Sequence, residues 1–104
     1  MPSRIHALQS FLEKTPDDSF LKHALALEYV KIEDDTAARS LFESVLNADP
    51  QYIGSYYHLG KLLERIGEYQ GAVNWYRKGL DASKSAGDMH AYNELYAALH
   101  DLIE

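Results

Sequence analysis

Apolar residues recur along this chain at the spacing of α-helices, and the polar residues between them collect into short breaks. Two stretches carry apolar side chains in an i, i+4, i+7 order: Leu25, Tyr29 and Ile32, and later Leu59, Leu63 and Ile66. That order places the side chains of each stretch on one face of an α-helix. The whole pattern predicts six helices, over residues 4–14, 19–32, 36–47, 53–66, 69–85 and 88–103.

Capping and helix-breaking residues mark the ends of these helices. Ser3 can cap the first helix, and the later breaks fall at Thr15-Pro16-Asp17, Glu33-Asp34-Asp35, Gly67-Glu68 and Gly87-Asp88. Such residues favour helix starts and turns over helix interiors. The paired carboxylates Asp17-Asp18 and Asp34-Asp35 stand at helix starts, where negative charge is favourable. We therefore interpret them as caps and not as acid catalysts.

The pattern repeats after 34 residues. At this shift Leu8 aligns with Phe42 and Tyr76, Leu12 with Leu46 and Leu80, Ala26 with Gly60, Ala38 with Ala72, and Pro16 with Pro50. Each period contains two helices, and small residues recur where two helix backbones must approach closely. The prediction is an all-α fold, an antiparallel helix-turn-helix solenoid.

The repeat divides the chain into four segments of a single domain, residues 1–104. We expect an N-terminal half-repeat helix in residues 1–16, two full repeats in 19–52 and 53–86, and a C-terminal capping helix in 88–104. An apolar stripe on this last helix would seal one end of the stack: Tyr92, Leu95, Tyr96, Leu99, Leu102 and Ile103. Its other face carries polar and acidic residues.

These residues resemble the tetratricopeptide-repeat family. The second repeat reads Tyr56-x2-Leu59-Gly60-x2-Leu63 and then Ala72-x3-Tyr76; the first reads Lys22-x2-Leu25-Ala26-x2-Tyr29, then Ala38-x3-Phe42 and Pro50. The family pattern is aromatic-x2-Leu-Gly-x2-Tyr, Ala-x3-Phe and Pro. Lys22 departs from it by replacing an aromatic residue, and Lys84 by replacing the closing proline. The chain is similar to small bacterial members of unassigned function.

Composition and charge exclude several classes of function. The 104 residues contain no cysteine, and ten basic against sixteen acidic side chains give a formal net charge of −6. Disulfides and thiolate metal sites are therefore excluded, and no histidine spacing, phosphate loop or nucleophile motif indicates chemistry. We expect no enzyme activity, no cofactor and no metal. No apolar run approaches the roughly 20 residues that span a bilayer, and the N-terminus lacks a signal-peptide block, so a cytoplasmic protein is expected.

The aromatic residues are expected in the core. Five of them occupy apolar repeat positions: Tyr29, Phe42, Tyr56, Tyr69 and Tyr76. Because the protein is acidic and has no large basic patch, nucleic-acid binding is not expected. The polar face of the last helix is acidic, whereas helices that bind membrane surfaces are rich in lysine and arginine. A membrane partner is therefore not expected either.

A candidate binding groove follows from the first helix of each pair, because the resemblance implies that these helices line an inner curve that binds peptides or helices. Two stripes should lie side by side there: Phe20, His23, Leu27 and Lys31, and Tyr57, His58, Lys61 and Arg65. The two lining helices carry four cations (Lys22, Lys31, Lys61, Arg65) and two carboxylates (Glu28, Glu64), a balance of +2. Since the whole chain carries −6, the remainder carries −8.

Two interpretations of this charge contrast remain open. A basic groove in an acidic protein would attract an acidic segment of another protein. Alternatively, lysine and arginine are common on exposed helix faces, and glutamates three residues away could neutralise them locally. The leading hypothesis is a non-catalytic adaptor, a monomer that binds an acidic peptide or helix. The alternative is a self-assembly module, a homodimer that associates through its end helices.

Overall fold

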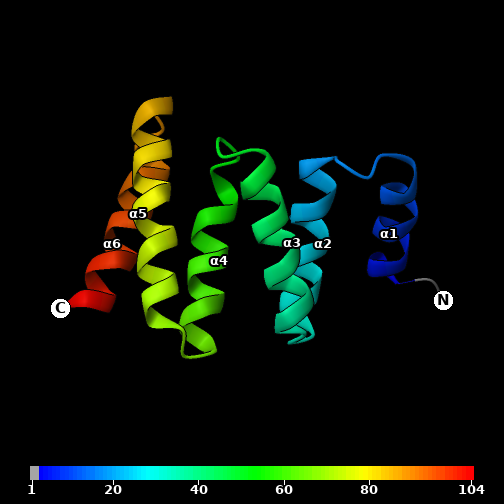
Figure 1. The fold of residues 1–104 in the computed structure, drawn as a ribbon, viewed down its shortest axis with the longest axis horizontal. Helices are drawn as coiled ribbons and strands as arrows, with labels where there is room; N and C mark the ends of the chain where they lie inside the picture. Colours follow the sequence, from blue (N-terminus) through cyan, green and yellow to red (C-terminus); the bar gives the residue numbers. More distant parts are fainter. Residues whose placement is uncertain (1–2) are drawn as a thin grey trace.

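Six α-helices joined by short turns make up residues 3–104, the part of the chain that the computed structural model describes. The helices are α1 (Arg4–Lys14), α2 (Ser19–Lys31), α3 (Asp35–Ala48), α4 (Gly54–Arg65), α5 (Tyr69–Ala86) and α6 (Met89–Ile103). They stand side by side in a row, with α1 at one end and α6 at the other (Figure 1). All six predicted helices are confirmed, and their ends differ from the prediction by no more than one residue.

Side-chain caps explain why the helix starts could be predicted. Four caps accept a hydrogen bond from a backbone N–H in the first helical turn: Ser3 from His6, Asp18 from Leu21, Asp34 from Ala37 and Asp88 from Ala91. Each bond satisfies a donor that has no partner within the helix. Asp18 and Asp34 are thus caps, as the sequence indicated.

The turns after α4 and α5 each use a glycine in the left-handed region, Gly67 (φ 82°) and Gly87 (φ 70°). Glu33, which stands 34 residues before Gly67, adopts the same conformation with φ 60°. Residues other than glycine are uncommon in the left-handed region, whereas glycine adopts it without strain. In all three turns the chain reverses so that the next helix can pack antiparallel to the previous one.

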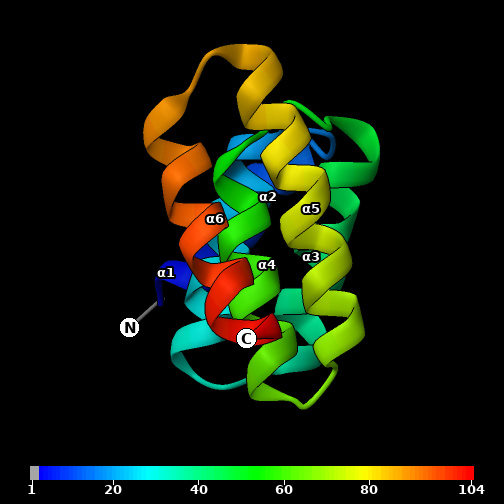
Figure 2. The same ribbon diagram turned by 90° about the vertical axis from the view of Figure 1, so that its left-hand side faces the viewer.

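The closest packing is between α2 and α3, between α4 and α5, and equally between α5 and α6, while α1 contacts α2 at the other end of the stack. The stack measures 44 × 29 × 19 Å, and Figure 2 shows α6 covering its C-terminal end. The predicted all-α helix-turn-helix solenoid is therefore confirmed. The exact division into repeats stays a prediction, and residues 1–2 of its first segment lie outside the described residues.

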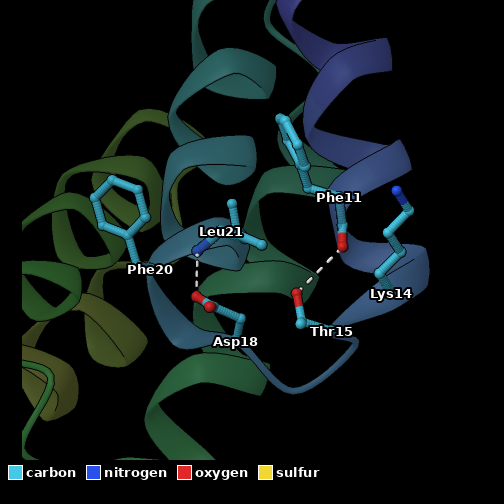
Figure 3. Close-up of a pocket in the computed structure, with 6 residues that line it drawn as sticks. All are labelled: Phe11, Lys14, Thr15, Asp18, Phe20 and Leu21. Carbon is cyan, nitrogen blue, oxygen red and sulfur yellow. Dashed lines mark hydrogen bonds between the residues drawn. The ribbon is translucent and has the colours of Figure 1, made fainter.

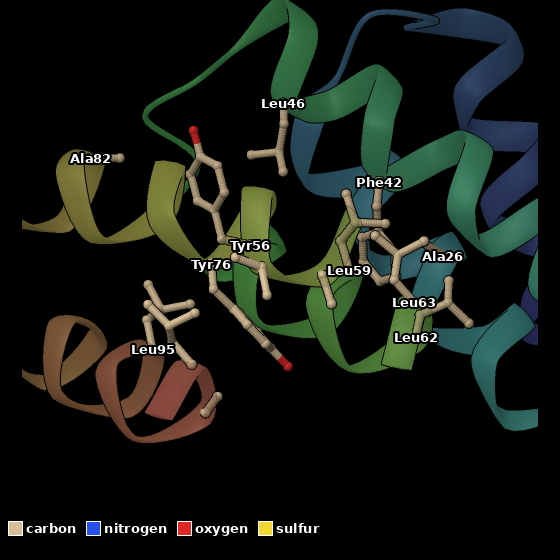
Figure 4. Close-up of a cluster of buried hydrophobic side chains, with 14 of the residues drawn as sticks. Ala26, Phe42, Leu46, Tyr56, Leu59, Leu62, Leu63, Tyr76, Ala82 and Leu95 are labelled. Carbon is tan, nitrogen blue, oxygen red and sulfur yellow. The ribbon is translucent and has the colours of Figure 1, made fainter. Parts of the chain in front are cut away.

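The main core fills the space between neighbouring pairs (Figure 4). Phe42 of α3 and Tyr76 of α5 are fully buried, as are the small residues Ala38 and Ala72. Gly60 lets α4 approach the Tyr76 ring so closely that a Cβ atom there would lie 2.1 Å from Cε1 of the tyrosine. At Gly60 the two helices of the second pair thus approach too closely for a side chain.

Several apolar residues of the predicted helical stripes are exposed, so the core position expected for Tyr69 and the burial expected for Tyr96 and Ile103 in the capping stripe were wrong. They are Ile32 (61% exposed), Ile66 (39%), Tyr69 (57%), Tyr96 (48%) and Ile103 (48%). Ile32 and Ile66 follow the last residue of α2 and of α4, and Tyr69 is the first residue of α5, so these three lie at the edge of the stack. Tyr96 and Ile103 belong to the end helix, whose outer side has no described neighbour.

Candidate functional site

A groove runs between the first helices of the two pairs, α2 and α4. It consists of two adjoining cavities of about 580 Å³ and 260 Å³ that share Val30 and His58. The larger cavity is lined by Arg4, Phe20, His23, Ala24, Leu27, Glu28, Val30, Lys31 and His58, and the smaller by Val30, His58, Lys61, Leu62 and Arg65. We call these two cavities together the α2–α4 groove.

Seven of the eight residues proposed for the site line this groove. Phe20, His23, Leu27, Lys31, His58, Lys61 and Arg65 all contribute to its walls. Tyr57 does not line either cavity; its ring packs 5.7 Å from the His58 ring and 5.7 Å from Nζ of Lys61. The two predicted stripes therefore lie side by side, because α2 and α4 are the corresponding helices of successive pairs.

Two imidazole rings form the middle of the groove. The ring centroids of His23 and His58 are 5.6 Å apart, and both rings contact Phe42 of the core, at 5.6 Å and 6.2 Å. Nδ1 of His23 lies 2.7 Å from Oγ of Ser55, which is completely buried. These contacts hold the two rings in place between the core and the open groove.

Both imidazoles are kept neutral at pH 7. Burial, together with the nearby positive charge that His58 would carry, lowers the pKa of His23 from 6.5 to about 4. Burial also lowers the pKa of His58, and Glu94 of α6 acts in the opposite direction. Desolvation disfavours the charged form of a histidine, which explains the common direction of the two shifts. The floor of the groove is consequently uncharged near neutral pH.

We expect the free energy of unfolding to fall by about 1–2 kcal/mol between pH 7.5 and pH 5 because of His23. Its pKa is lower in the folded state than in the unfolded state, so the unfolded state binds more protons as the pH falls from 6.5 towards 4. Urea unfolding of wild type and His23→Gln at both pH values measures this. The wild type should lose more stability than His23→Gln, and the exposed control His90→Gln should behave as the wild type. Equal losses in all three proteins would contradict the prediction.

Ion pairs moderate the charge of the groove rim. Nζ of Lys31 lies 2.9 Å from Oε2 of Glu28, Nζ of Lys61 lies 3.7 Å from Oε2 of Glu64, and Arg65 pairs with Asp35 of α3. Solvent-exposed pairs of this kind contribute roughly 0–1 kcal/mol each. Neutralisation by a glutamate three residues away, one of the two interpretations left open by the sequence, therefore applies in part to Lys31 and Lys61, while Arg65 is paired with a residue of another helix.

The structure changes which charges belong to the groove. Lys22 points away from it, because its Nζ donates a hydrogen bond to Oγ of Ser44 on α3 at 3.0 Å. Arg4 of α1 takes its place and lies 3.5 Å from Glu28. Of the described residues that line the groove, four are cations and Glu28 is the one carboxylate. The groove therefore keeps a positive balance, but with Arg4 in place of Lys22.

A second cavity, which the sequence did not predict, opens between α1 and the start of α2. It measures about 370 Å³ and is lined by Phe11, Lys14, Thr15, Asp18, Phe20 and Leu21 (Figure 3). Phe11 and Phe20 are 57% and 64% exposed. Phe20 borders this cavity and the α2–α4 groove, so the two hollows are neighbours. The sequence could have indicated this cavity, because Phe11 and Phe20 each lie beside the apolar stripe of their helix and not within it.

Residues 3–104 contain neither a metal site nor a membrane-spanning helix. No group of three or more histidine, aspartate or glutamate side chains is arranged to hold a metal ion in this part of the chain. None of the helices described above is long and apolar enough to cross a membrane.

Known proteins share this helical arrangement. A family model, the tetratricopeptide repeat, matches residues 53–85. A TPR repeat-containing protein of Pseudomonas aeruginosa is 28% identical over 98 residues, 94% of this chain and 93% of that protein. The crystal structure of a tetratricopeptide repeat domain protein from Salinibacter ruber is similar with a TM-score of 0.78 and 36% identity, over 82% of this chain and 96% of that one. A protein from Bordetella parapertussis has a TM-score of 0.84 and 30% identity, over 98% and 89% of the two chains.

Proposed function

Because this chain belongs to the tetratricopeptide-repeat family, we propose that it is a non-catalytic binding module whose α2–α4 groove takes up a peptide segment of another protein. Repeat proteins of this kind stack helix pairs into a curved surface that serves protein–protein interaction. The observation that carries the proposal is the composition of the groove. An apolar floor, which includes Leu27, Val30 and Leu62, lies among four cationic side chains.

The proposed ligand is an amphipathic segment with acidic residues beside its apolar ones. Its apolar side chains would cover the floor of the groove, and its carboxylates would meet Arg4, Lys31, Lys61 and Arg65. Charge of opposite sign steers such a segment towards the groove and selects it over basic segments. The partial neutralisation of the rim by Glu28 and Glu64 limits this effect. We therefore expect an affinity in the micromolar range, about −8 kcal/mol.

A series of peptides that differ only in charge tests the proposal. The peptides share their apolar positions and carry glutamate, glutamine or lysine at the flanking positions, and fluorescence anisotropy measures their binding. We expect the glutamate peptides to bind most tightly and to lose about tenfold in affinity with Lys61→Glu/Arg65→Glu, since roughly 1.4 kcal/mol corresponds to a factor of ten. Added salt should weaken the same complex.

Arg77→Glu/Lys84→Glu serves as the matched control, because it makes the same change of charge on exposed positions of α5 outside the groove. This control should bind the glutamate peptides as the wild type does. Equal binding of the glutamate and lysine peptides would overturn the acidic ligand. Equal binding by both double variants would place the peptide outside the α2–α4 groove.

A further inference from the structure

The hollow between α1 and the start of α2, which we call the α1–α2 cavity, is walled by two aromatic rings and one aliphatic side chain. Phe11 and Phe20 are 57% and 64% exposed, and Leu21 lies between them (Figure 3). Single exposed apolar side chains are ordinary on a protein surface, whereas several that share one hollow are typical of a binding site. The α1–α2 cavity is therefore a candidate site beside the α2–α4 groove.

The polar groups of the α1–α2 cavity favour an uncharged, apolar occupant. Oγ1 of Thr15 donates a hydrogen bond to the carbonyl oxygen of Phe11 at 3.1 Å, and Oδ1 of Asp18 accepts one from the backbone N–H of Leu21 at 2.9 Å. The two charged residues of the wall, Lys14 and Asp18, carry opposite signs. A polar occupant would lose its water without a matched partner, whereas a large apolar side chain gains by leaving water.

The α1–α2 cavity and the α2–α4 groove belong to one surface. On α1, Arg4 lines the groove, and Phe11 and Lys14, which line the cavity, follow it at i+7 and i+10. This spacing places the three side chains on one face of the helix. On α2, Phe20 lines both hollows. A ligand in the groove can therefore reach the cavity by passing over the Phe20 ring.

The length of the groove sets how many peptide residues lie before the cavity. The residues of α2 that line the groove extend from Lys31 to Phe20. A helix that rises 1.5 Å per residue covers about 16 Å between these two positions. An extended peptide advances about 3.3 Å per residue, so about five peptide residues match this length. The residues that follow them at the Phe20 end would lie at the α1–α2 cavity.

We propose that the peptide bound in the α2–α4 groove continues past Phe20 and places one large apolar side chain, preferably aromatic, in the α1–α2 cavity. This inference rests on the proposed function of the groove and adds an anchor residue to its ligand. An aromatic ring is preferred because it can pack edge-to-face against Phe11 and Phe20. The groove then selects the charge of the segment, and the cavity fixes its register, since a pocket for one side chain allows one alignment.

Peptides that share one acidic amphipathic core and differ in a single added residue test the proposal by fluorescence anisotropy. The added residue is phenylalanine, leucine, alanine or glutamate, and it is placed just beyond the N-terminal or the C-terminal end of the core. We expect phenylalanine at one of the two ends to tighten binding about tenfold relative to alanine. Leucine should have an intermediate effect, and glutamate should give no gain. The gain is confined to one end because the peptide lies in the groove in one direction.

Three variants locate the added ring. Phe11→Ser removes one wall of the α1–α2 cavity and should reduce the gain from phenylalanine to less than about twofold. Phe11 is 57% exposed, so this variant should fold, which circular dichroism verifies. Phe11→Leu keeps the wall apolar and should keep most of the gain. Met89→Ser is the matched control, because it removes a 55% exposed apolar side chain from α6, at the opposite end of the stack from α1. It should show the full gain.

Other outcomes overturn the proposal and separate it from the proposed function. The alanine peptide may be weakened by Lys61→Glu/Arg65→Glu while phenylalanine gives no gain at either end; the groove then binds the peptide, and the α1–α2 cavity holds no anchor. A gain that persists in Phe11→Ser, or that is equal at both ends, places the ring outside the cavity. A phenylalanine peptide that Lys61→Glu/Arg65→Glu does not weaken binds without the groove. Absence of binding by every peptide overturns both proposals.

Discussion

Gly60→Leu is expected to lower the free energy of unfolding by about 3 kcal/mol, the upper part of the range for overpacked cores. A Cβ atom at this position would lie 2.1 Å, 2.5 Å and 2.6 Å from three ring atoms of Tyr76. The ring cannot move aside easily, because it is fully buried and its hydroxyl group donates a hydrogen bond to Glu64. The helices α4 and α5 would have to separate. Urea unfolding measured by circular dichroism gives the change.

Gly71→Ala is the matched control for this prediction, because it also adds a side chain to a helical glycine of the same pair. A Cβ atom at Gly71 meets Cδ1 of Leu63 at 3.4 Å. Alanine favours a helix over glycine by about 1 kcal/mol. We expect Gly71→Ala to leave the stability unchanged or to raise it. A Gly60→Leu protein as stable as Gly71→Ala would show that the close approach of α4 and α5 is not required.

The helices could be predicted because their signals are local. Ser3, Asp18 and Asp34 precede helix starts, and Gly67 and Gly87 follow helix ends, so both limits are written into neighbouring residues. The 34-residue repeat then determines which helices pair, since one helix pair cannot bury its apolar face alone. Periodicity does not tell how far a neighbouring helix extends. For this reason Tyr69 was assigned to the core although it lies at an exposed helix start.

The groove could be predicted as two stripes but not as a complete surface. Helical spacing places His58, Lys61 and Arg65 on one face of α4, and the repeat places that face beside α2. The contribution of Arg4 depends on where α1 crosses α2, which is a matter of tertiary packing. The direction of Lys22 depends on its contact with Ser44 of α3. Both were missed because they arise between helices that are not equivalent in the repeat.

Phe42→Ala is expected to lower the free energy of unfolding by about 3–5 kcal/mol, as for other buried phenylalanines. The Phe42 ring is completely buried in the core that joins the first pair to the second. Removing it leaves a cavity between helices whose backbones are already close, so collapse around it is limited. Phe42→Leu keeps most of the volume and should cost less than about 1.5 kcal/mol. Equal losses for both variants would contradict the cavity explanation.

The same substitution should change the groove, because Phe42 supports its floor from below. The rings of His23 and His58 lie 5.6 Å and 6.2 Å from the Phe42 ring. Water that enters the space of the missing ring would reduce the desolvation of His23, which is the main cause of its lowered pKa. We expect an NMR titration of folded Phe42→Ala to show the pKa of His23 displaced from about 4 towards 6.5. An unchanged His23 pKa in that variant would mean that the other neighbours of His23, Ser55 and Tyr52, keep its ring desolvated, and that Phe42 does not.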